Sequence, residues 1–108
     1  MTPAPSVTVL ERAITETAWM RTVVQYATLH GWLCYHTFRS THSPSGFPDL
    51  CLVRPSATAR LVFAELKAET GKLTPTQEAW LIALRGVPGV EVFCWRPSDW
   101  PAVRDALR

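Results

Sequence analysis

The sequence lacks the features that mark membrane, secreted and strongly charged proteins. It contains no run of about 18 apolar residues and no basic start followed by an apolar stretch, so neither a transmembrane helix nor a signal peptide is predicted. Neither sign of charge is in large excess, because 11 Lys and Arg stand against 9 Asp and Glu, a formal net charge of +2. Attraction to a nucleic acid would therefore depend on where the charges lie. We expect a soluble, cytoplasmic protein.

Cysteine is scarce and has no metal-binding spacing. Cys34, Cys51 and Cys94 are odd in number, widely spaced and surrounded by apolar residues. This pattern argues against a disulfide framework and favours a reducing compartment. Without a C-x-x-C pair, a zinc site that combines the cysteines with His36 is disfavoured. We interpret all three cysteines as small core residues.

Repeats and low-complexity tracts are also missing, and the composition is that of a globular protein. Apolar residues make up 47% of the chain and charged residues 19%, which excludes the signature of extensive disorder. A length of 108 residues matches one compact domain. We therefore predict a disordered lead-in over residues 1–7, which contains Pro3 and Pro5, and a single domain over residues 8–108.

Hydrophobic periodicity and turn residues predict seven elements in the order α-β-β-β-α-β-α. An exposed loop at 40–47 and a turn at 54–59 separate the first three strands. The capping box Thr74-Pro75-Thr76-Gln77 begins the second helix, and Ser98 is the expected cap of the last. The predicted elements are a helix at 8–30, strands at 32–38, 49–53 and 60–67, a helix at 74–86, a strand at 90–95 and a helix at 98–107. The order indicates an α/β (α+β) domain with one mixed central sheet flanked by helices.

Glu65 and Lys67 are the most informative residues of the third predicted strand. Side chains in a strand alternate between faces, so these two must point the same way, as does Phe63. Opposite charges in an otherwise apolar strand need mutual pairing, a metal ion or water if they are buried. A surface salt bridge on an edge strand is the alternative interpretation.

Asp49 begins the preceding strand of the same predicted hairpin and could bring its carboxylate beside Glu65. Mg²⁺ favours one or two carboxylates together with water and phosphate oxygens, and a nearby Lys67 could serve the attacking water or the scissile phosphate. This set of residues suits metal-assisted phosphodiester hydrolysis. Alternatively, Asp49 only shapes the turn that follows Pro48.

At this point the sequence resembles a known family. Gly46-Phe47-Pro48-Asp49 followed by Glu65-Leu66-Lys67 resembles the PD-(D/E)XK nuclease signature. Thr15-Glu16-Thr17, Gly31-Trp32 and Leu73-Thr74-Pro75-Thr76-Gln77 extend the resemblance to the VRR-NUC family, over about residues 10 to 95. The resemblance implies a restriction-endonuclease-like αβββαβ core.

The resemblance also implies roles for particular residues. Asp49 and Glu65 would bind the metal ion, Mg²⁺ or Mn²⁺, with the backbone carbonyl of Leu66 as a third ligand. Lys67 would be the catalytic lysine. Glu16 would be the acidic residue that the family carries on its first helix, and the helical period places it on a stripe that should face the sheet. Alternatively, Glu16 points outward or bonds a helix cap.

Gln77 matches the glutamine of the family's last motif, which would position the nucleophilic water or a phosphate. Its role in the capping box explains it equally well, and both roles can hold together. The sequence departs from the family at Trp19, where a glutamine is often found. This departure puts only a supporting contact in doubt.

Several polar residues near the predicted site could contact nucleic acid. Arg39, His42 and Ser43 lie in the loop before Asp49, and Lys72 lies on the other side. As phosphate contacts they would position a strand without reading its sequence, although basic residues are often only solvated. His36 could be a general base or a phosphate donor, or simply a hydrogen-bonded strand histidine.

The resemblance implies a metal-dependent deoxyribonuclease. We expect a structure-selective endonuclease, similar to Holliday-junction resolvases, in phage or bacterial replication and repair; a phage-encoded enzyme would act in the host cytoplasm. It would act on branched or duplex DNA as a homodimer, because two-fold related sites can cut paired strands. The alternatives are a nucleic-acid-binding module without catalysis and a metal-free structural part of a replication assembly.

Overall fold

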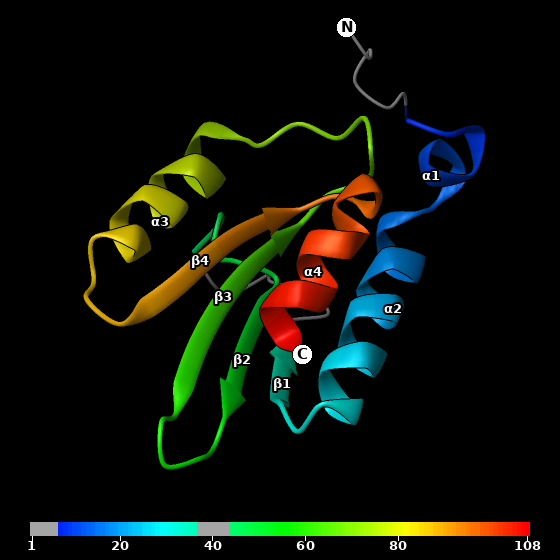
Figure 1. The fold of residues 1–108 in the computed structure, drawn as a ribbon. Coiled ribbons are helices and arrows are strands. Elements are labelled where there is room, and N and C mark those ends of the chain that lie inside the picture. Colours follow the sequence, from blue (N-terminus) through cyan, green and yellow to red (C-terminus); the bar gives the residue numbers. More distant parts are fainter. Residues whose placement is uncertain (1–6, 37–43) are drawn as a thin grey trace, which may run out of the picture.

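A computed structural model describes residues 7–36 and 44–108 of the chain and shows one four-stranded sheet with helices on both sides (Figure 1). The elements are α1 (Val9–Ala13), α2 (Glu16–Leu29), β1 (Leu33–His36), β2 (Leu50–Arg54), β3 (Arg60–Leu66), α3 (Pro75–Arg85), β4 (Val90–Trp95), the 3₁₀ turn η1 (Pro97–Asp99) and α4 (Trp100–Leu107). The predicted lead-in lies almost wholly outside the described residues.

The sheet is mixed, as predicted, with the strand order β1-β2-β3-β4. Strands β1, β2 and β3 form an antiparallel meander, and β4 pairs in parallel with β3. A parallel neighbour requires a crossover connection, which α3 provides. The predicted hairpin of the second and third strands is confirmed, and so is the α+β fold class.

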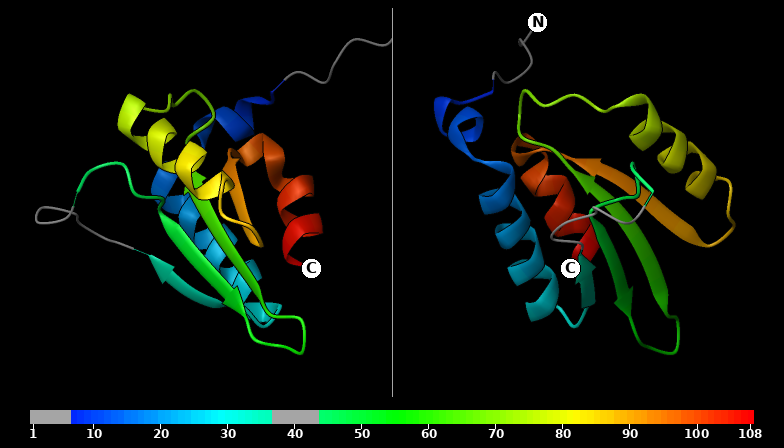
Figure 2. Two further views of the ribbon diagram at one scale, coloured as in Figure 1. Left: turned by 90° about the vertical axis from the view of Figure 1, so that its left-hand side faces the viewer. Right: turned by 180° about the vertical axis from the view of Figure 1, so that it is seen from behind.

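The main core lies between the sheet and the pair of helices α2 and α4, which cover the same face (Figures 1 and 2). Alternate residues of β3, Val62 and Ala64, are fully buried on this face against Val23 and Ala27 of α2. Residues of β3 between them point to the opposite face. There the ring of Phe47 lies 5.7 Å from that of Phe63 and 5.1 Å from that of Trp80 in α3. Helix α3 thus packs on the second face, next to β4.

The predicted first helix is wrong as a single element, because the chain forms two helices with a break at Ile14 and Thr15. Both residues are in an extended conformation. The Thr15 hydroxyl accepts a hydrogen bond of 3.1 Å from the backbone N–H of Ala18 and so caps α2. Ile14 packs against the core at the break. The Thr15 cap thus satisfies an amide that the break leaves without a partner in the helix.

The last predicted helix also begins differently. Ser98 lies within η1, and the N-cap of α4 is Asp99. The Ser98 hydroxyl and backbone N–H both donate to the carboxylate of Glu69, at 2.5 and 3.0 Å. A tertiary contact has therefore replaced the predicted cap, because the segment after β3 supplies a stronger, charged acceptor.

Three smaller predictions can be compared with the structure. The first strand ends at His36, and Phe38 lies outside the described residues. Cys34, Cys51 and Cys94 are free and half-buried on three different strands. Within residues 7–36 and 44–108, every helix is too short or too polar to cross a membrane.

Two buried tryptophans donate hydrogen bonds to backbone carbonyls of the C-terminal part of the chain. The Trp19 indole donates to the carbonyl of Trp95 at 3.0 Å, so α2 is bonded to the end of β4. The Trp32 indole donates to the carbonyl of Leu107 at 2.9 Å. Trp19, the position that departs from the family pattern, is therefore a core residue with a satisfied donor.

Candidate active site

Three acidic residues from separate elements meet at one end of the sheet. Glu16 begins α2, Asp49 directly precedes β2, and Glu65 is the penultimate residue of β3. One carboxylate oxygen of each residue lies within 4.8 Å of the others. The antiparallel pairing causes this meeting, because Leu50 at the start of β2 lies opposite Ala64 near the end of β3.

Glu65 is the most deeply buried member of the cluster. Only 2% of its surface is exposed, and its Oε2 has no hydrogen-bond partner among the described residues. Burial, followed by the neighbouring Asp49 carboxylate, raises the pKa of Glu65 to about 9 against the opposing charge of Lys67. A divalent cation would compensate both the missing hydrogen bond and the crowding of negative charge. The donor set, three carboxylates, consists of the hard oxygen ligands that Mg²⁺ and Mn²⁺ prefer.

Asp49 is held in place by the backbone of the neighbouring strand. Its Oδ2 accepts a hydrogen bond of 2.9 Å from the N–H of Leu66. The second oxygen remains available to a cation, because a carboxylate can accept on both oxygens. The role of the Leu66 carbonyl as a metal ligand stays a prediction.

Glu16 joins the cluster, but it is exposed and not buried on the face of the helix that was predicted to face the sheet. Val23 and Ala27 on that face are buried, but Glu16 itself is exposed, as the break before α2 places it in the first turn. Its carboxylate nevertheless reaches the other two acids from the solvent side. Glu16 therefore closes the open side of the cluster.

Lys67 follows β3 directly and is 9% exposed. Its backbone N–H donates to the Trp95 carbonyl at 3.0 Å, so the parallel pairing continues one residue past the strand. Its positive charge opposes the rise in the pKa of Glu65 that burial and Asp49 cause. A buried lysine with a buried carboxylate beside it excludes the alternative of an exposed surface salt bridge.

Gln77 makes two contacts, one within the capping box of α3 and one with the acidic cluster. Its Oε1 accepts from the Thr74 backbone N–H at 2.9 Å, which completes the capping box of α3. Its Nε2 donates to Oε1 of Glu65 at 3.5 Å, a long hydrogen bond. The capping box fixes the amide so that its donor end points at the cluster.

We expect Gln77→Glu to keep the fold and to lower activity. The new carboxylate still accepts from Thr74, but it replaces the donor to Glu65 with a like charge. The metal-dependent cleavage that the resemblance implies should fall by about tenfold or more, since one contact that orients the site is lost. Thermal unfolding and cleavage assays of the variant measure both effects. If stability and cleavage are unchanged together, Gln77 acts only as a cap.

The loop that carries Asp49 packs tightly on the start of α3. Gly46 has a φ of +96°, and a Cβ there would lie 2.7 Å from the backbone carbon and oxygen of Thr76. Only glycine permits this approach. The contact brings the loop and Gln77 together, so the two sides of the site are assembled by backbone packing.

Gly46→Ala should therefore destabilise the protein by about 2 kcal/mol or more, because positive φ and backbone overlap both oppose the methyl group. Gly89→Ala is a matched control, since Gly89 has a φ of +81° with no atom within 4 Å of a Cβ. The difference between the two melting temperatures isolates the overlap. Equal losses for both variants would contradict tight packing at Gly46.

The other predicted site residues lie outside the acidic cluster or outside the described part of the chain. His36 is half-buried at the end of β1, opposite Leu50 in register. Lys72 is exposed between β3 and α3. The predicted nucleic-acid contacts that lie outside the described residues are Arg39, His42 and Ser43.

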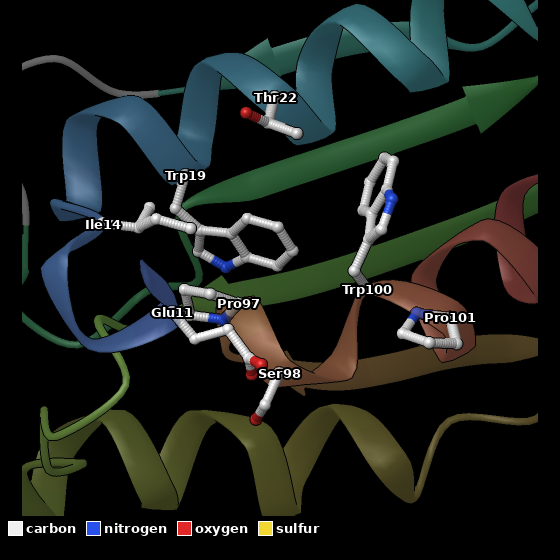
Figure 3. Close-up of a pocket in the computed structure, with 8 residues that line it drawn as sticks. All are labelled: Glu11, Ile14, Trp19, Thr22, Pro97, Ser98, Trp100 and Pro101. Atoms are coloured by element: carbon white, nitrogen blue, oxygen red, sulfur yellow. The ribbon is translucent and has the colours of Figure 1, made fainter. Parts of the chain in front are cut away.

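A separate cavity of about 430 Å³ lies between α1, the start of α2, η1 and the start of α4 (Figure 3). Trp19 and Trp100 line it with their rings 6.0 Å apart in an edge-to-face arrangement, and Ile14 and Pro97 add apolar surface. No predicted site residue lines it. The acidic cluster is thus not part of this cavity.

Two polar residues at the same end of the sheet, Glu69 and Arg96, were not among the predicted site residues. Arg96 donates a hydrogen bond to the carbonyl of Gly71. Glu69 accepts one from the backbone N–H of Ser98. Their positions in the sequence could have indicated this, because Glu69 closely follows β3 and Arg96 directly follows β4. The carboxyl ends of neighbouring parallel strands lie at the same edge of a sheet.

Comparison with known proteins gives one consistent result. The family model of the VRR-NUC domain matches residues 12–96. A solved structure described as a VRR_NUC domain superposes with a TM-score of 0.68 at 21% sequence identity, covering 89% of this chain and 100% of that chain. At this identity, the likeness bears on the fold alone. A comparison with curated protein sequences gives no match.

Proposed function

Since the chain belongs to the VRR-NUC domain family, whose members are nucleases, we propose that it hydrolyses DNA phosphodiester bonds with Mg²⁺ or Mn²⁺ bound by Asp49 and Glu65. The observation that carries this proposal is the carboxylate cluster with the buried, unpartnered oxygen of Glu65. Such an oxygen is expected where a cation completes the coordination.

The metal ion would supply charge that stabilises the developing phosphorane-like transition state and would lower the pKa of a bound water. The protein residues would provide the remaining functions. Asp49 and Glu65 would hold the ion, with Glu16 on the solvent side. Lys67 would neutralise negative charge on the reacting phosphate, and the amide of Gln77 would orient Glu65 and the water beside it.

The site suits a substrate phosphate that approaches from solvent. Glu65 and Lys67 form a buried floor, whereas Glu16 is exposed at the rim. Lys72 is exposed on the segment after Lys67 and would contact a neighbouring phosphate of the same strand. His36, Arg39, His42 and Ser43, which precede Asp49 in the sequence, are proposed as further contacts.

We further propose that the substrate is branched DNA and that two copies of the chain act together. Two-fold related sites can cut both strands of a branch, which a single small domain with one site cannot do in one encounter. The resemblance to junction-resolving nucleases supports this choice, together with a role in phage or bacterial replication and repair.

A panel of labelled DNA substrates tests the proposal directly. The purified chain is incubated with single-stranded, duplex, flap and four-way-junction DNA in the presence of Mg²⁺, Mn²⁺ or EDTA. We expect metal-dependent cleavage of the branched substrates and none with EDTA. Binding of DNA without cleavage under every metal condition would indicate a catalytically inactive nucleic-acid-binding module instead.

A further inference from the structure

The turn that follows Lys67 is hydrogen-bonded to the residues that follow β4, the strand beside β3. Residues 68–71 form a tight turn, in which the N–H of Gly71 donates to the carbonyl of Ala68 at 2.9 Å. The turn leads on to Thr74 and α3, so it joins the segment of Lys67 to that of Gln77. Two contacts hold it, one to Glu69 within the turn and one to Gly71 at its end.

Arg96 makes the first contact, from the position just after β4. Its Nη2 donates to the carbonyl of Gly71 at 2.7 Å, and its Nη1 donates to the thiol of Cys94 at 3.7 Å. The backbone of Arg96 is itself locked, because it exchanges hydrogen bonds of 2.8 Å with Asp99 in both directions. The guanidinium is therefore a fixed donor that holds the end of the turn.

Glu69 makes the second contact. Its two carboxylate oxygens accept from the backbone N–H and the hydroxyl of Ser98, which lies in η1. Charge-assisted hydrogen bonds on both oxygens fix the carboxylate in one orientation. The turn is thus clamped between η1 and the end of β4, and the pair Arg96 and Glu69 is called the turn clamp below.

The clamped turn passes close to the side chain of Lys67. Glycine has no Cβ, but one built on Gly71 would lie 3.5 Å from Cδ of Lys67, so Gly71 is a near neighbour of the lysine stem. Lys67 is 9% exposed although it lies outside the strand. A lysine side chain loses much rotamer freedom when it is confined in this way, and a catalytic lysine gains from being ordered before the substrate arrives.

We propose that Arg96 and Glu69 are positioning residues that hold the turn 68–71 over the stem of Lys67 and thereby fix its ammonium group beside Glu65. Their role in cleavage rests on the proposed nuclease function, but the confinement of Lys67 does not. Neither residue belongs to the carboxylate cluster or contacts it through a hydrogen bond of the described residues. The clamp acts only through the turn.

Chemical labelling of lysine tests the confinement without any assay of activity. Lys67 and Lys72 are the only lysines in the chain, and Lys72 is exposed, so it serves as an internal reference. Reductive methylation with formaldehyde and a borohydride, read by mass spectrometry after digestion with a protease that does not cut at lysine, gives both rates. In the wild type we expect Lys67 to react at least about tenfold more slowly than Lys72.

The substitution Arg96→Ala should reduce that ratio to about threefold or less, because the turn is then free to leave the lysine stem. Should Arg96→Ala not fold, Glu69→Ala removes only the solvent-exposed half of the clamp and carries the same comparison. Arg85→Ala, at an exposed position of α3, is the matched control and should leave the ratio unchanged. Undiminished protection of Lys67 in folded clamp variants would overturn the proposal.

Cleavage kinetics then test whether the confinement serves the reaction. Arg96→Ala should lower kcat about tenfold with KM changed less than about twofold, since the lysine acts on the transition state. In a Lys67→Ala background the same substitution should add less than about a twofold loss. A full loss in both backgrounds would show that Arg96 acts independently of Lys67 and would overturn its positioning role. If the wild type cleaves no substrate, the nuclease proposal fails while the labelling result still decides the clamp.

Discussion

Asp49→Ala is expected to abolish both stabilisation by metal and DNA cleavage. A cation that binds only the folded wild type at about 100 times its Kd stabilises it by about 2.7 kcal/mol, which raises the Tm of a domain of this size by about 10 °C or more. Without Asp49, the buried Glu65 remains beside a single exposed partner, Glu16. Titration of Mg²⁺ and Mn²⁺ during thermal unfolding measures the first effect. Cleavage should fall by about 10³-fold or more, which corresponds to about 4 kcal/mol of transition-state stabilisation.

Two further variants make the Asp49 result specific. Asp49→Asn keeps an oxygen that can accept from the N–H of Leu66, so the variant should fold like the wild type and still lose the metal response. Asp105→Ala removes an exposed carboxylate of α4 that pairs only with Arg108 in the described structure, and it should respond to metal normally. A normal metal response in Asp49→Ala would show that the ion binds elsewhere and would remove the basis of the proposed function.

Lys67→Met is expected to lower cleavage by about 10²-fold or more while metal and DNA binding persist. Methionine keeps most of the buried stem of Lys67 and loses the charge. A group that serves the transition state affects kcat more than ground-state binding. Single-turnover cleavage, together with a DNA-binding assay in Ca²⁺, separates the two quantities.

The control for Lys67 is a positively charged side chain that lies away from the acidic cluster. Arg85→Met removes an exposed positive charge from α3 and should retain cleavage within about twofold. If Lys67→Met cleaves DNA at nearly the wild-type rate, Lys67 would be only a charge partner that makes burial of Glu65 tolerable.

The positions of several site residues could be predicted from the sequence, because short-range patterns determine the local structure around them. Glu65 and Lys67 follow from strand alternation, and the capping box at Gln77 needs only four consecutive residues. The proximity of Asp49 to Glu65 follows from the hairpin, because antiparallel pairing brings the start of one strand to the end of the other.

The break before α2 was not foreseeable from local pattern. Residues 8–30 contain neither Pro nor Gly, and a threonine such as Thr15 is tolerated inside a helix. What decides the break is tertiary packing, since Ile14 inserts at the core and α1 lies against η1. The exposed position of Glu16 and the bond between Ser98 and Glu69 depend on the same long-range contacts. Sequence periodicity carries no information about such partners.

The double hydrogen bond on the carbonyl of Trp95 has an evolutionary consequence. This one acceptor binds the indole of Trp19 and the N–H of Lys67, and it therefore connects the helix of Glu16 to the segment of the lysine. Any amino acid at position 95 supplies the same carbonyl, so these hydrogen bonds place no demand on that side chain, which is constrained instead by its burial in the core. Position 19 is different, because a replacement must fill the core and also carry a donor that reaches across it. Descendants of this sequence should therefore keep an apolar side chain at residue 95 without any need for a donor, whereas residue 19 should keep both bulk and a donor.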